Sequence, residues 1–583
     1  MIRRFESRVH RTARPDPYPD PAARVVLDGS ATQALDTGRT RLLVAGVVFA
    51  LAFLVVGGRL VEITLLTQGN EPRLAEAPSM APLKTGRADI VDRNGIVLAT
   101  NLPTASLYAN PRQVLDAEEA ARLLAGALPE LSQAEVRAKL STDRGFIWLK
   151  RNLTPRQQYA INRLGIPGLY FQREQRRYYP HGSLTAHSVG FTDVDTKGLA
   201  GIEQSFDEVL RGSAEPLALS LDLRVQYVLA RELAAAMAAF RAIGAAGMVL
   251  DAMSGEILAM VSLPGFDPNR PGRAAADARF NRASLGVYEM GSVFKIFTTA
   301  MALDAGVVTL DDGYDTSKPI RAARFTITDY KPKNRWQSVP EIFIHSSNIG
   351  TVRMAMDAGT KAQRAFLGRL GLTRPATVEL AEVGQPMVPS PWREINTMTI
   401  AYGHGLAVSP VQLTSAVAAV VNGGELKPAT LIKRADGERS PGRRVISRAT
   451  SLQMRQLMRL VVRHGTGRKA NAAGYLVGGK TGTADKLIAG RYARNARIAS
   501  FIGAFPMIDP RFVIFAMVDE PKGNESTHGY ATGGWVAAPV VRRVIERIGP
   551  LLGVAPTEGG QEDDDGERLF VRAKARAQRL ASN

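Results

Sequence analysis

The chain has 583 residues, a formal net charge of +19 and no cysteine. Its length predicts several domains, and 45% hydrophobic with 22% charged residues is the composition of a globular protein. The absence of cysteine excludes disulfides, thiolate metal sites and cysteine nucleophiles. The positive charge indicates anionic partners, but it is scattered rather than gathered in a nucleic-acid motif, so we expect an anionic polymer or membrane surface and no nucleic acid.

An arginine- and proline-rich segment precedes a long apolar run. Residues 1–41 have the composition of a disordered tail. Residues 42–66 predict an uncleaved transmembrane signal-anchor helix, because the apolar run reaches about 20 residues and no small-residue cleavage site follows directly. More arginines precede this run than follow it, which predicts a cytoplasmic N-terminus and places the bulk of the chain outside.

Arg59 and Glu62 lie one helical turn apart at the outer end of the anchor. One interpretation is an i,i+3 ion pair whose side chains reach toward the interface. The other is a contact with a partner membrane protein, since ionisable groups at such depth are often functional.

Residues 67–220 contain no catalytic string and predict a separate domain. Asn94-Gly95 predicts a turn between two strand-like runs, 90–91 and 96–98. Residues 117–140 have helical periodicity.

Residues 221–553 predict a second domain, followed by a mobile charged tail over 554–583. Strand-like runs occur at both ends of this domain, and a mostly helical stretch, 292–425, lies between them. This order predicts an α+β fold whose sheet is completed by both ends. The expected elements are a helix over 221–239, a hairpin of 246–251 with 256–261, and strands over 475–477, 498–505 and 512–518.

The first of three chemical strings is Ser292-Val293-Phe294-Lys295. It predicts Ser292 in the first turn of a buried helix, with Lys295 on the same face. A serine hydroxyl needs a base to become a nucleophile, and Lys295 can serve only if burial and a second cation, Lys480, lower its pKa. The alternative for this string alone is a helix-capping serine followed by a surface lysine.

The second string, Ser346-Ser347-Asn348, is predicted in a loop before a helix. Ser346 is placed to pass a proton between Lys295 and a leaving amine. The Asn348 side chain can both donate to and accept from a substrate amide. For this string alone a helix cap is the favoured alternative.

The third string, Lys480-Thr481-Gly482-Thr483, is predicted on an edge strand. Lys480 and Gly482 then face one way and the two threonines the other. Gly482 would let a peptide approach and pair as an added strand, while Lys480 and the threonine hydroxyls hold a terminal carboxylate. The backbone N–H groups of Ser292 and Thr483 would form an oxyanion hole.

A rival motif overlaps the third string. Residues Gly474 to Thr481 match the phosphate-binding P-loop pattern, and Phe515–Asp519 resembles a strand ending in a magnesium-binding aspartate, so an ATPase is the alternative. Against it, residues 471–474 are not strand-like, 475–477 look like a strand themselves, and the anchor places the segment outside the cytoplasm.

With these residues in hand, the chain resembles class B penicillin-binding proteins, in particular the cell-division transpeptidases of the FtsI type. The similarity runs from about Leu42 to Gly553. One departure is Met290, where the family usually has proline. Besides the three strings, the resemblance rests on Arg87 with Asp92-Arg93-Asn94-Gly95, Arg177-Tyr178-Tyr179-Pro180, Gly201-Ile202-Glu203, Ala401–Gly405, Ser409-Pro410 with Gln412, Gly533-Gly534 and Ala538-Pro539.

The resemblance implies a transpeptidase domain of the penicillin-binding and serine β-lactamase type, with an antiparallel sheet and a helical subdomain, behind an elongated α+β pedestal over 67–220. It implies D,D-transpeptidation of peptidoglycan stem peptides during septum formation: Ser292 forms an acyl-enzyme, D-alanine leaves, and β-lactams acylate the same serine. It also implies the inner membrane with a periplasmic catalytic domain, FtsW and other division proteins as partners, and no cofactor.

Metal binding is not expected, because His181 and His187 lack a ligand spacing and a carboxylate cluster. Two weaker alternatives stay open. One is an elongation-type homologue with the same chemistry. The other is a β-lactam sensor or inactive scaffold, although the 41-residue N-terminal tail is too short for an effector domain of a sensor.

Overall fold

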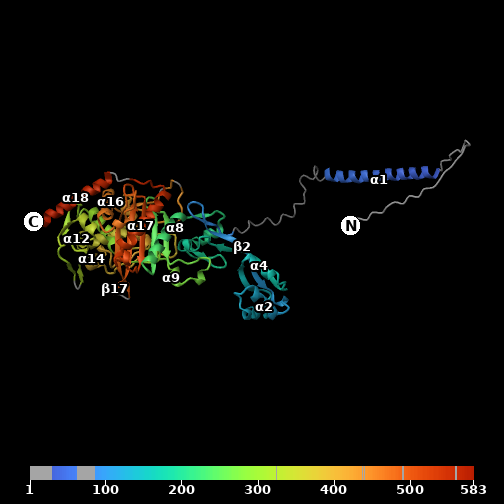
Figure 1. Cartoon of the computed structure of the whole chain (residues 1–583), viewed down its shortest axis with the longest axis horizontal. Coiled ribbons are helices and arrows are strands. Elements are labelled where there is room, and N and C mark those ends of the chain that lie inside the picture. The colour runs from blue at the N-terminus through green and yellow to red at the C-terminus, as the bar shows by residue number, and fades with distance from the viewer. Residues whose placement is uncertain are drawn as a thin grey trace, which may run out of the picture. The chain divides into compact units, whose positions relative to one another are not determined.

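The computed structural model describes residues 29–61 and 86–582, with gaps at 323–324, 436, 439, 489–490 and 558–560. The chain divides into two units between Lys84 and Thr85. Figure 1 shows the elements in chain order, from blue at the N-terminus to red at the C-terminus.

Helix α1 (Gly29–Val61) is the described part of the first unit (Figure 1). Its segment Thr40–Arg59 has a mean hydropathy of 2.3 and is long and apolar enough to cross a membrane. The helix begins earlier than predicted, so the expectation of disorder is wrong for residues 29–41. Glu62 lies outside the described residues, and its pairing with Arg59 stays a prediction.

The first part of the second unit is built on one long strand. Its elements are β1 (Ile90–Val91), β2 (Val97–Ala109), α2 (Ala117–Ala127), α3 (Gln133–Leu140), β3 (Ile147–Leu153), α4 (Pro155–Asn162), β4 (Leu169–Tyr178), α5 (Ala186–Val189), β5 (Phe191–Thr192), β6 (Gly198–Ala200), α6 (Gly201–Ser205), α7 (Asp207–Gly212) and β7 (Leu217–Ala218). The sheet order is β3-β2-β1-β7, and β4 also pairs with β2.

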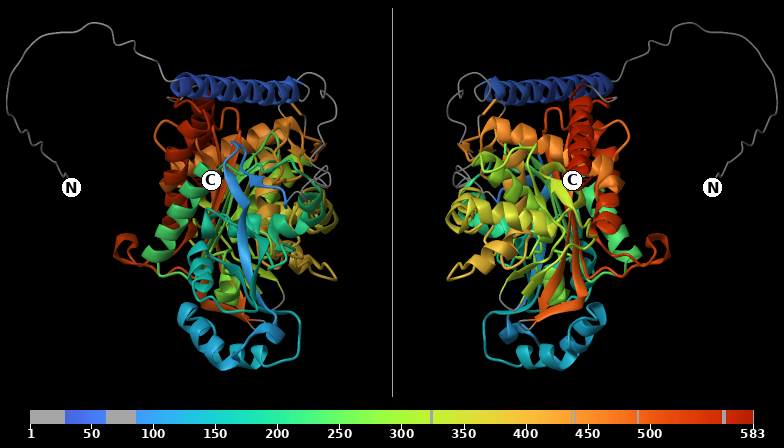
Figure 2. Two further views of the ribbon diagram at one scale, coloured as in Figure 1. Left: turned by 90° about the vertical axis from the view of Figure 1, so that its right-hand side faces the viewer. Right: turned by 90° about the vertical axis from the view of Figure 1, so that its left-hand side faces the viewer.

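The turn predicted at Asn94-Gly95 is confirmed, because it joins β1 to an antiparallel β2. The single helical stretch predicted over 117–140 is two helices, α2 and α3, which pack with α4 around their own small core. Figure 2 shows these helices gathered at one end of the long strand β2.

Three segments that carry the family resemblance meet in one buried ion cluster. The Glu203 carboxylate accepts from Arg177 Nε at 2.6 Å and, through its other oxygen, from Arg87 Nε. A second Arg87 nitrogen donates to Asp207 at 2.6 Å. Both arginines and Glu203 are buried. Since a buried charge is costly unless it is paired, each of these residues needs the others.

The rest of the second unit centres on a five-stranded antiparallel sheet. Its strands and flanking helices are α8 (Leu223–Ala239), β8 (Gly244–Asp251), β9 (Ile257–Leu263), β16 (Gly478–Ile488), β17 (Arg491–Phe505), β18 (Phe512–Asp519) and α17 (Gly533–Leu551). The order β16-β17-β18-β8-β9 confirms that both ends of the domain complete one sheet. The predicted strand over 475–477 is wrong: these buried residues precede β16, and burial alone does not distinguish such a segment from a strand.

The predicted helical stretch is confirmed between β9 and β16, with short hairpins set into it. Its elements are α9 (Ala276–Arg279), η5 (Gly291–Phe294), α10 (Lys295–Asp304), β10 (Gly313–Asp315), β11 (Ile320–Ala322), β12 (Phe325–Ile327), β13 (Trp336–Ser338), α11 (Val339–His345), α12 (Asn348–Ala358), α13 (Thr360–Arg369), α14 (Glu394–Ala401), α15 (Pro410–Val421), β14 (Glu425–Leu426), β15 (Arg443–Arg444) and α16 (Arg448–His464).

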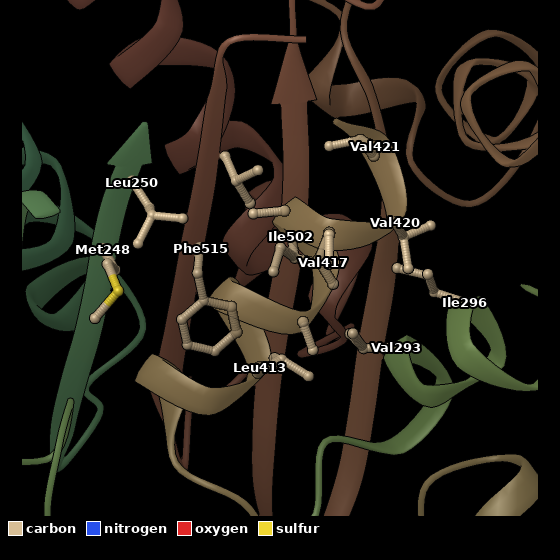
Figure 3. Close-up of a cluster of buried hydrophobic side chains, with 14 of the residues drawn as sticks. Met248, Leu250, Val293, Ile296, Leu413, Val417, Val420, Val421, Ile502 and Phe515 are labelled. Atoms are coloured by element: carbon tan, nitrogen blue, oxygen red, sulfur yellow. The ribbon is translucent and has the colours of Figure 1, made fainter. Parts of the chain in front are cut away.

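Helices cover both faces of the sheet. Helices α8 and α17 pack on one face, where Val249 of β8 points. On the other face, Met248 belongs to a core shared with α10, α15 and α16, as the alternation of a strand requires. Figure 3 shows Leu413 and Val417 of α15 near Phe515 of the sheet and Val293 of η5. The central helix α15 therefore anchors the segment that begins α10.

The C-terminal segment forms a helix, α18 (Gln561–Ser582), so the predicted mobile tail is wrong for these residues. Leu569 is buried against the domain, Phe570 stacks on His464 of α16 at 4.1 Å, and Glu567 lies 2.8 Å from the same histidine. The prediction from charged composition missed a narrow apolar stripe at helical spacing, which includes the buried residues Leu569 and Ala573. Helix α18 also contacts α11, the helix that leads into Ser346.

We expect Leu569→Ala to lower the free energy of unfolding by about 2–4 kcal/mol, because it deletes a buried side chain and leaves a cavity. Val571 lies on the same helix but is 59% exposed, so Val571→Ala should change the free energy of unfolding by less than about 0.5 kcal/mol. Denaturant titration of both variants measures the difference. Equal, small effects would mean that α18 does not dock in solution.

Candidate active site

The nucleophile string forms a tight turn at the start of a buried helix. Gly291–Phe294 is one 3₁₀ turn, and Lys295 begins α10 directly after it. Ser292 therefore lies in the 3₁₀ turn just before α10 rather than in the first turn of that helix, and it is partly exposed. Gly291 has a φ of +52°, and a Cβ there would lie 2.5 Å from the carbonyl oxygen of Thr483. Glycine therefore lets this turn lie directly against β16.

The second string precedes a helix, as predicted, although only Ser346 and Ser347 lie in the link between α11 and α12, and Asn348 is the first residue of α12. Ser346 follows the last residue of α11 and has the left-handed conformation, with φ 60° and ψ 46°. This conformation costs a residue with a side chain about 1–2 kcal/mol. Ser347 caps α12 by accepting from the Gly350 N–H at 3.1 Å. The helix-cap interpretation therefore holds for Ser347, which leaves the Ser346 hydroxyl for other contacts.

The third string lies on β16, the edge strand of the sheet, and its side chains alternate as predicted. Lys480 points toward Ser346. The threonines point the other way: the Thr481 hydroxyl lies 2.7 Å from that of Thr466, and the Thr483 hydroxyl accepts from the Gly533 N–H at 3.1 Å.

Gly482 has a different structural role from the one expected. A Cβ at this position would lie 2.6 Å from the carbonyl oxygen of Met290 and 2.4 Å from Ser500 Oγ. The missing side chain therefore lets β16 pack against the nucleophile turn. Whether a peptide also pairs with this strand stays a prediction.

The three strings converge on the Ser346 hydroxyl. Lys295 Nζ and Lys480 Nζ each lie 3.0 Å from Ser346 Oγ. Lys295 also donates to the Ser346 carbonyl oxygen at 2.5 Å and to Asn348 Oδ1 at 2.7 Å. No hydrogen bond joins Ser292 to Lys295 in the part of the chain that the structure describes. Catalytic hydrogen bonds often form only once a substrate is bound.

Burial and the charge of Lys480 lower the pKa of Lys295, as the sequence predicted. Lys295 is fully buried, and its pKa lies well below the ordinary value because of burial first and the charge of Lys480 second. Asp329 opposes both effects by raising the pKa of Lys295. Burial lowers the pKa of Lys480 to about 7. A neutral lysine and a cationic one can therefore coexist here near neutral pH.

The low pKa of Lys480 predicts a pH-dependent stability. Between about 7 and the ordinary lysine pKa of 10.5, the unfolded chain binds a proton that the folded chain does not. The free energy of unfolding should therefore rise with pH over this window, by up to about 1.4 kcal/mol for each pH unit. We expect the thermal midpoint to rise less between pH 7 and 9 in Lys480→Met than in the wild type. Identical slopes in both proteins would contradict this assignment.

Sequence reasoning missed three residues around the site. Asp329 accepts three hydrogen bonds from the segment of Ser347 to Ile349. The Thr328 carbonyl oxygen accepts from Asn348 Nδ2 at 2.9 Å, and Thr466 contacts Thr481. No motif marks these residues, because each reaches the site across the fold rather than along the chain.

The P-loop interpretation is wrong. A P-loop connects a strand to the N-terminus of a helix. Here Gly478 to Thr481 lie inside β16, which continues to Ile488 and pairs along its length with β17. No helix begins directly after Thr481 in the described chain, so no helix N-terminus is present here to bind a nucleotide phosphate.

Comparisons with known proteins agree with this geometry. The family described as penicillin-binding protein transpeptidase domain matches residues 245–546, and the penicillin-binding protein dimerisation domain matches residues 82–222. The boundaries predicted above, 67–220 and 221–553, differ somewhat from these ranges and stay predictions.

Relatives are similar over most of the chain. It is 43% identical over 482 residues to the probable peptidoglycan D,D-transpeptidase FtsI of Caulobacter vibrioides, covering 80% of this chain and 82% of that protein. It is 30% identical over 555 residues to the peptidoglycan D,D-transpeptidase FtsI of Escherichia coli K12, covering 89% and 92%.

A solved structure of penicillin binding protein 3 from Mycobacterium tuberculosis, complexed with aztreonam, matches with a TM-score of 0.65 and 25% identity. The match covers 81% of this chain and 98% of that one. With a dimerisation domain ahead of a transpeptidase domain, and three strings converging on one serine hydroxyl, this chain belongs to the class B penicillin-binding proteins.

Proposed function

We propose that this chain is a peptidoglycan D,D-transpeptidase that crosslinks stem peptides through an acyl-enzyme on Ser292. The observation that carries the proposal is the Ser346 hydroxyl, 3.0 Å from the amines of two buried lysines, beside the turn that bears Ser292. Such an arrangement suits a proton relay between a base, a nucleophile and a leaving amine.

In the acylation step, Ser292 Oγ attacks the carbonyl carbon of the penultimate D-alanine, and its proton passes to neutral Lys295. The backbone N–H groups of Ser292 and Thr483 hold the oxyanion of the tetrahedral intermediate. The peptide C–N bond then breaks. The departing D-alanine amine takes the proton from Lys295 through Ser346, which leaves an ester on Ser292.

The second step reverses these proton transfers. An amine of a neighbouring stem attacks the ester carbonyl and loses a proton toward Ser346 and Lys295. The ester C–O bond breaks, Ser292 recovers its proton, and a new amide joins the two stems. The same attack on the strained amide of a β-lactam gives a stable ester, so β-lactams should block the site.

Substrate is held by the groups around the relay. Lys480 with the hydroxyls of Thr481 and Thr483 is proposed to bind the terminal carboxylate. This requires both threonines to exchange their present partners, Thr466 and the Gly533 N–H, for the carboxylate. Asn348 is proposed to donate to a substrate amide from Nδ2, while its Oδ1 keeps the contact with Lys295 Nζ.

The membrane arrangement belongs to the same proposal. Helix α1 would anchor the chain in the inner membrane as its single span, with the N-terminus in the cytoplasm and the catalytic domain in the periplasm. Arg59 and Glu62 would contact an FtsW-like glycosyltransferase. Similarity to FtsI supports a septal rather than an elongation role. Depletion should then block septation and give filaments, whereas rounded cells would indicate elongation.

A fluorescent penicillin and a peptide map test the proposal together. Detergent-extracted full-length protein is labelled, digested and analysed by mass spectrometry. We expect one adduct, on the peptide containing Ser292, and release of D-alanine in step with crosslinking when pentapeptide stems are supplied. A folded protein that takes no label, or that is labelled on another residue, would contradict the proposal.

A further inference from the structure

Asp329 holds the segment that carries Ser346 and Asn348. It lies just after β12 and is 9% exposed. Its Oδ2 accepts from the Ser347 hydroxyl at 2.7 Å, and its Oδ1 accepts from the backbone N–H groups of Asn348 at 2.5 Å and Ile349 at 3.0 Å. Helix α12 begins here, and its unpaired N–H groups favour a negative charge.

The neighbouring residue holds Asn348 from the same side. The Thr328 carbonyl oxygen accepts from Asn348 Nδ2, so the amide oxygen Oδ1 is turned toward Lys295 Nζ, 2.7 Å away. Residues 328 and 329 together therefore fix both the backbone and the side-chain orientation of Asn348.

The contacts of Asp329 matter because the segment that they fix, Ser346 to Asn348, supplies every hydrogen-bond partner that Lys295 Nζ has in the described structure. Two are the carbonyl oxygen and hydroxyl of Ser346, and the third is Asn348 Oδ1. Ser346 itself is in a left-handed conformation that costs free energy and persists only where the surroundings hold it. A shift of this segment would move all three acceptors away from Lys295 at once.

We propose that Asp329 is a positioning residue for acylation: its carboxylate holds the start of α12, and with it Ser346 and Asn348, against Lys295. The inference rests on the proposed function, because it concerns the same reaction on Ser292. Asp329 touches none of the reacting atoms and acts through the segment that it holds.

The charge of Asp329 gives the proposal a second readout. Two titratable side chains act on Lys295: Lys480 from β16 lowers its pKa and Asp329 raises it. The charge of Lys295 in turn lowers the pKa of His404, in the loop after α14. The pKa of His404 is lowered, by burial first, while the charge of the neighbouring Glu289 opposes this shift. The negative charge of Asp329 raises the pKa of Lys295 against burial and Lys480.

Loss of the Asp329 charge therefore has a defined sign. It lowers the pKa of Lys295 further, so that more of this lysine is neutral at a given pH. If neutral Lys295 is the base, the acid limb of the rate of acylation against pH moves to lower pH. A residue that only stabilises the fold would not move this limb.

Two variants separate position from charge. Asp329→Asn keeps an oxygen for the N–H groups of Asn348 and Ile349 but removes the charge, whereas Asp329→Ala removes all three hydrogen bonds. We measure the second-order rate constant for acylation by a fluorescent penicillin from pH 5 to 9. Asp329→Ala should lose about 100-fold, the effect of displacing a reacting group by about 1 Å. Asp329→Asn should recover most of the rate, with its acid limb at lower pH.

Asp304 offers a matched control. It holds the start of another helix, α16, by accepting from the Ser447 N–H at 2.8 Å and the Thr450 hydroxyl at 3.0 Å. Asp304→Asn should leave both the rate and the pH profile of acylation unchanged, and thermal melts verify folding of every variant.

Two results would overturn the inference: wild-type rates in Asp329→Ala, or equal losses in both Asp329 variants with an unmoved profile. If Asp329→Ala does not fold, the pH profile of Asp329→Asn tests the inference: an acid limb at lower pH supports it, and an unmoved limb contradicts it. A wild-type protein that takes no label contradicts the proposed function instead.

Discussion

Ser292→Ala abolishes covalent labelling by a fluorescent penicillin and stops crosslinking of stem peptides. No other hydroxyl can take over, because the ester forms on the oxygen that the substitution removes. For steady-state turnover we expect a loss on the order of 10⁶-fold, as for other serine nucleophiles. Gel fluorescence of the detergent-extracted protein measures the label, and chromatography of digested glycan measures the crosslinks.

The variant should remain folded, because Ser292 is partly exposed and its hydroxyl makes no hydrogen bond within the described residues. Ser213→Ala is the matched control, since within the described residues its hydroxyl bonds only to the backbone carbonyl oxygen and N–H of Glu215, in the dimerisation domain. It should label at the wild-type rate. Residual labelling of Ser292→Ala at wild-type level would place the nucleophile elsewhere.

Lys295→Met should lower the rate of acylation by about 10²–10⁴-fold, the usual contribution of a general base. Methionine has a similar length and no charge, so it fits the fully buried position without adding a cation. Because the base is gone, the acid limb that neutral Lys295 gives to the rate of acylation against pH should disappear. Stopped-time labelling across the pH range measures both the loss and the flattened profile.

Lys486→Met is the control for Lys295→Met. Lys486 lies on β16, the strand of Lys480, but pairs with Asp519 at 2.9 Å and with Glu520 at 2.9 Å, outside the site. Its loss should reduce stability and leave the pH profile of acylation in place. If Lys295→Met kept the wild-type rate, Lys295 would not be the base, and Lys480 would be the remaining candidate.

Two segments of the chain show where sequence patterns mislead. Residues 561–582 are rich in charge, which favours a mobile tail, yet a narrow stripe around Leu569 and Phe570 docks a helix on α16. Composition averages over all faces of a helix, whereas docking depends on one face alone. The apolar run at 475–477 misled in another way: these residues are buried but form no strand, and an apolar sequence indicates burial without specifying a strand.

The sequence by itself was enough to predict the chemistry of this protein. Three short strings in one order predicted a nucleophile, a base, a relay residue and a carboxylate-binding group, and the alternation of strand-like and helical runs predicted one sheet built from both ends of the domain. Such signals are local, because they consist of residue type, spacing and periodicity. A family resemblance adds an expected fold and expected roles for the residues.

Only the tertiary structure decided what those residues contact. It placed one hydroxyl, that of Ser346, between two lysines. It also showed that Gly482 allows β16 to pack closely against the turn that bears Ser292. It also brought Asp329 to the start of α12. The burial that lowers the pKa values of Lys295 and Lys480 comes from helices and strands far away in the chain. Hydrogen-bond partners and burial are set by packing, which no spacing along the chain records.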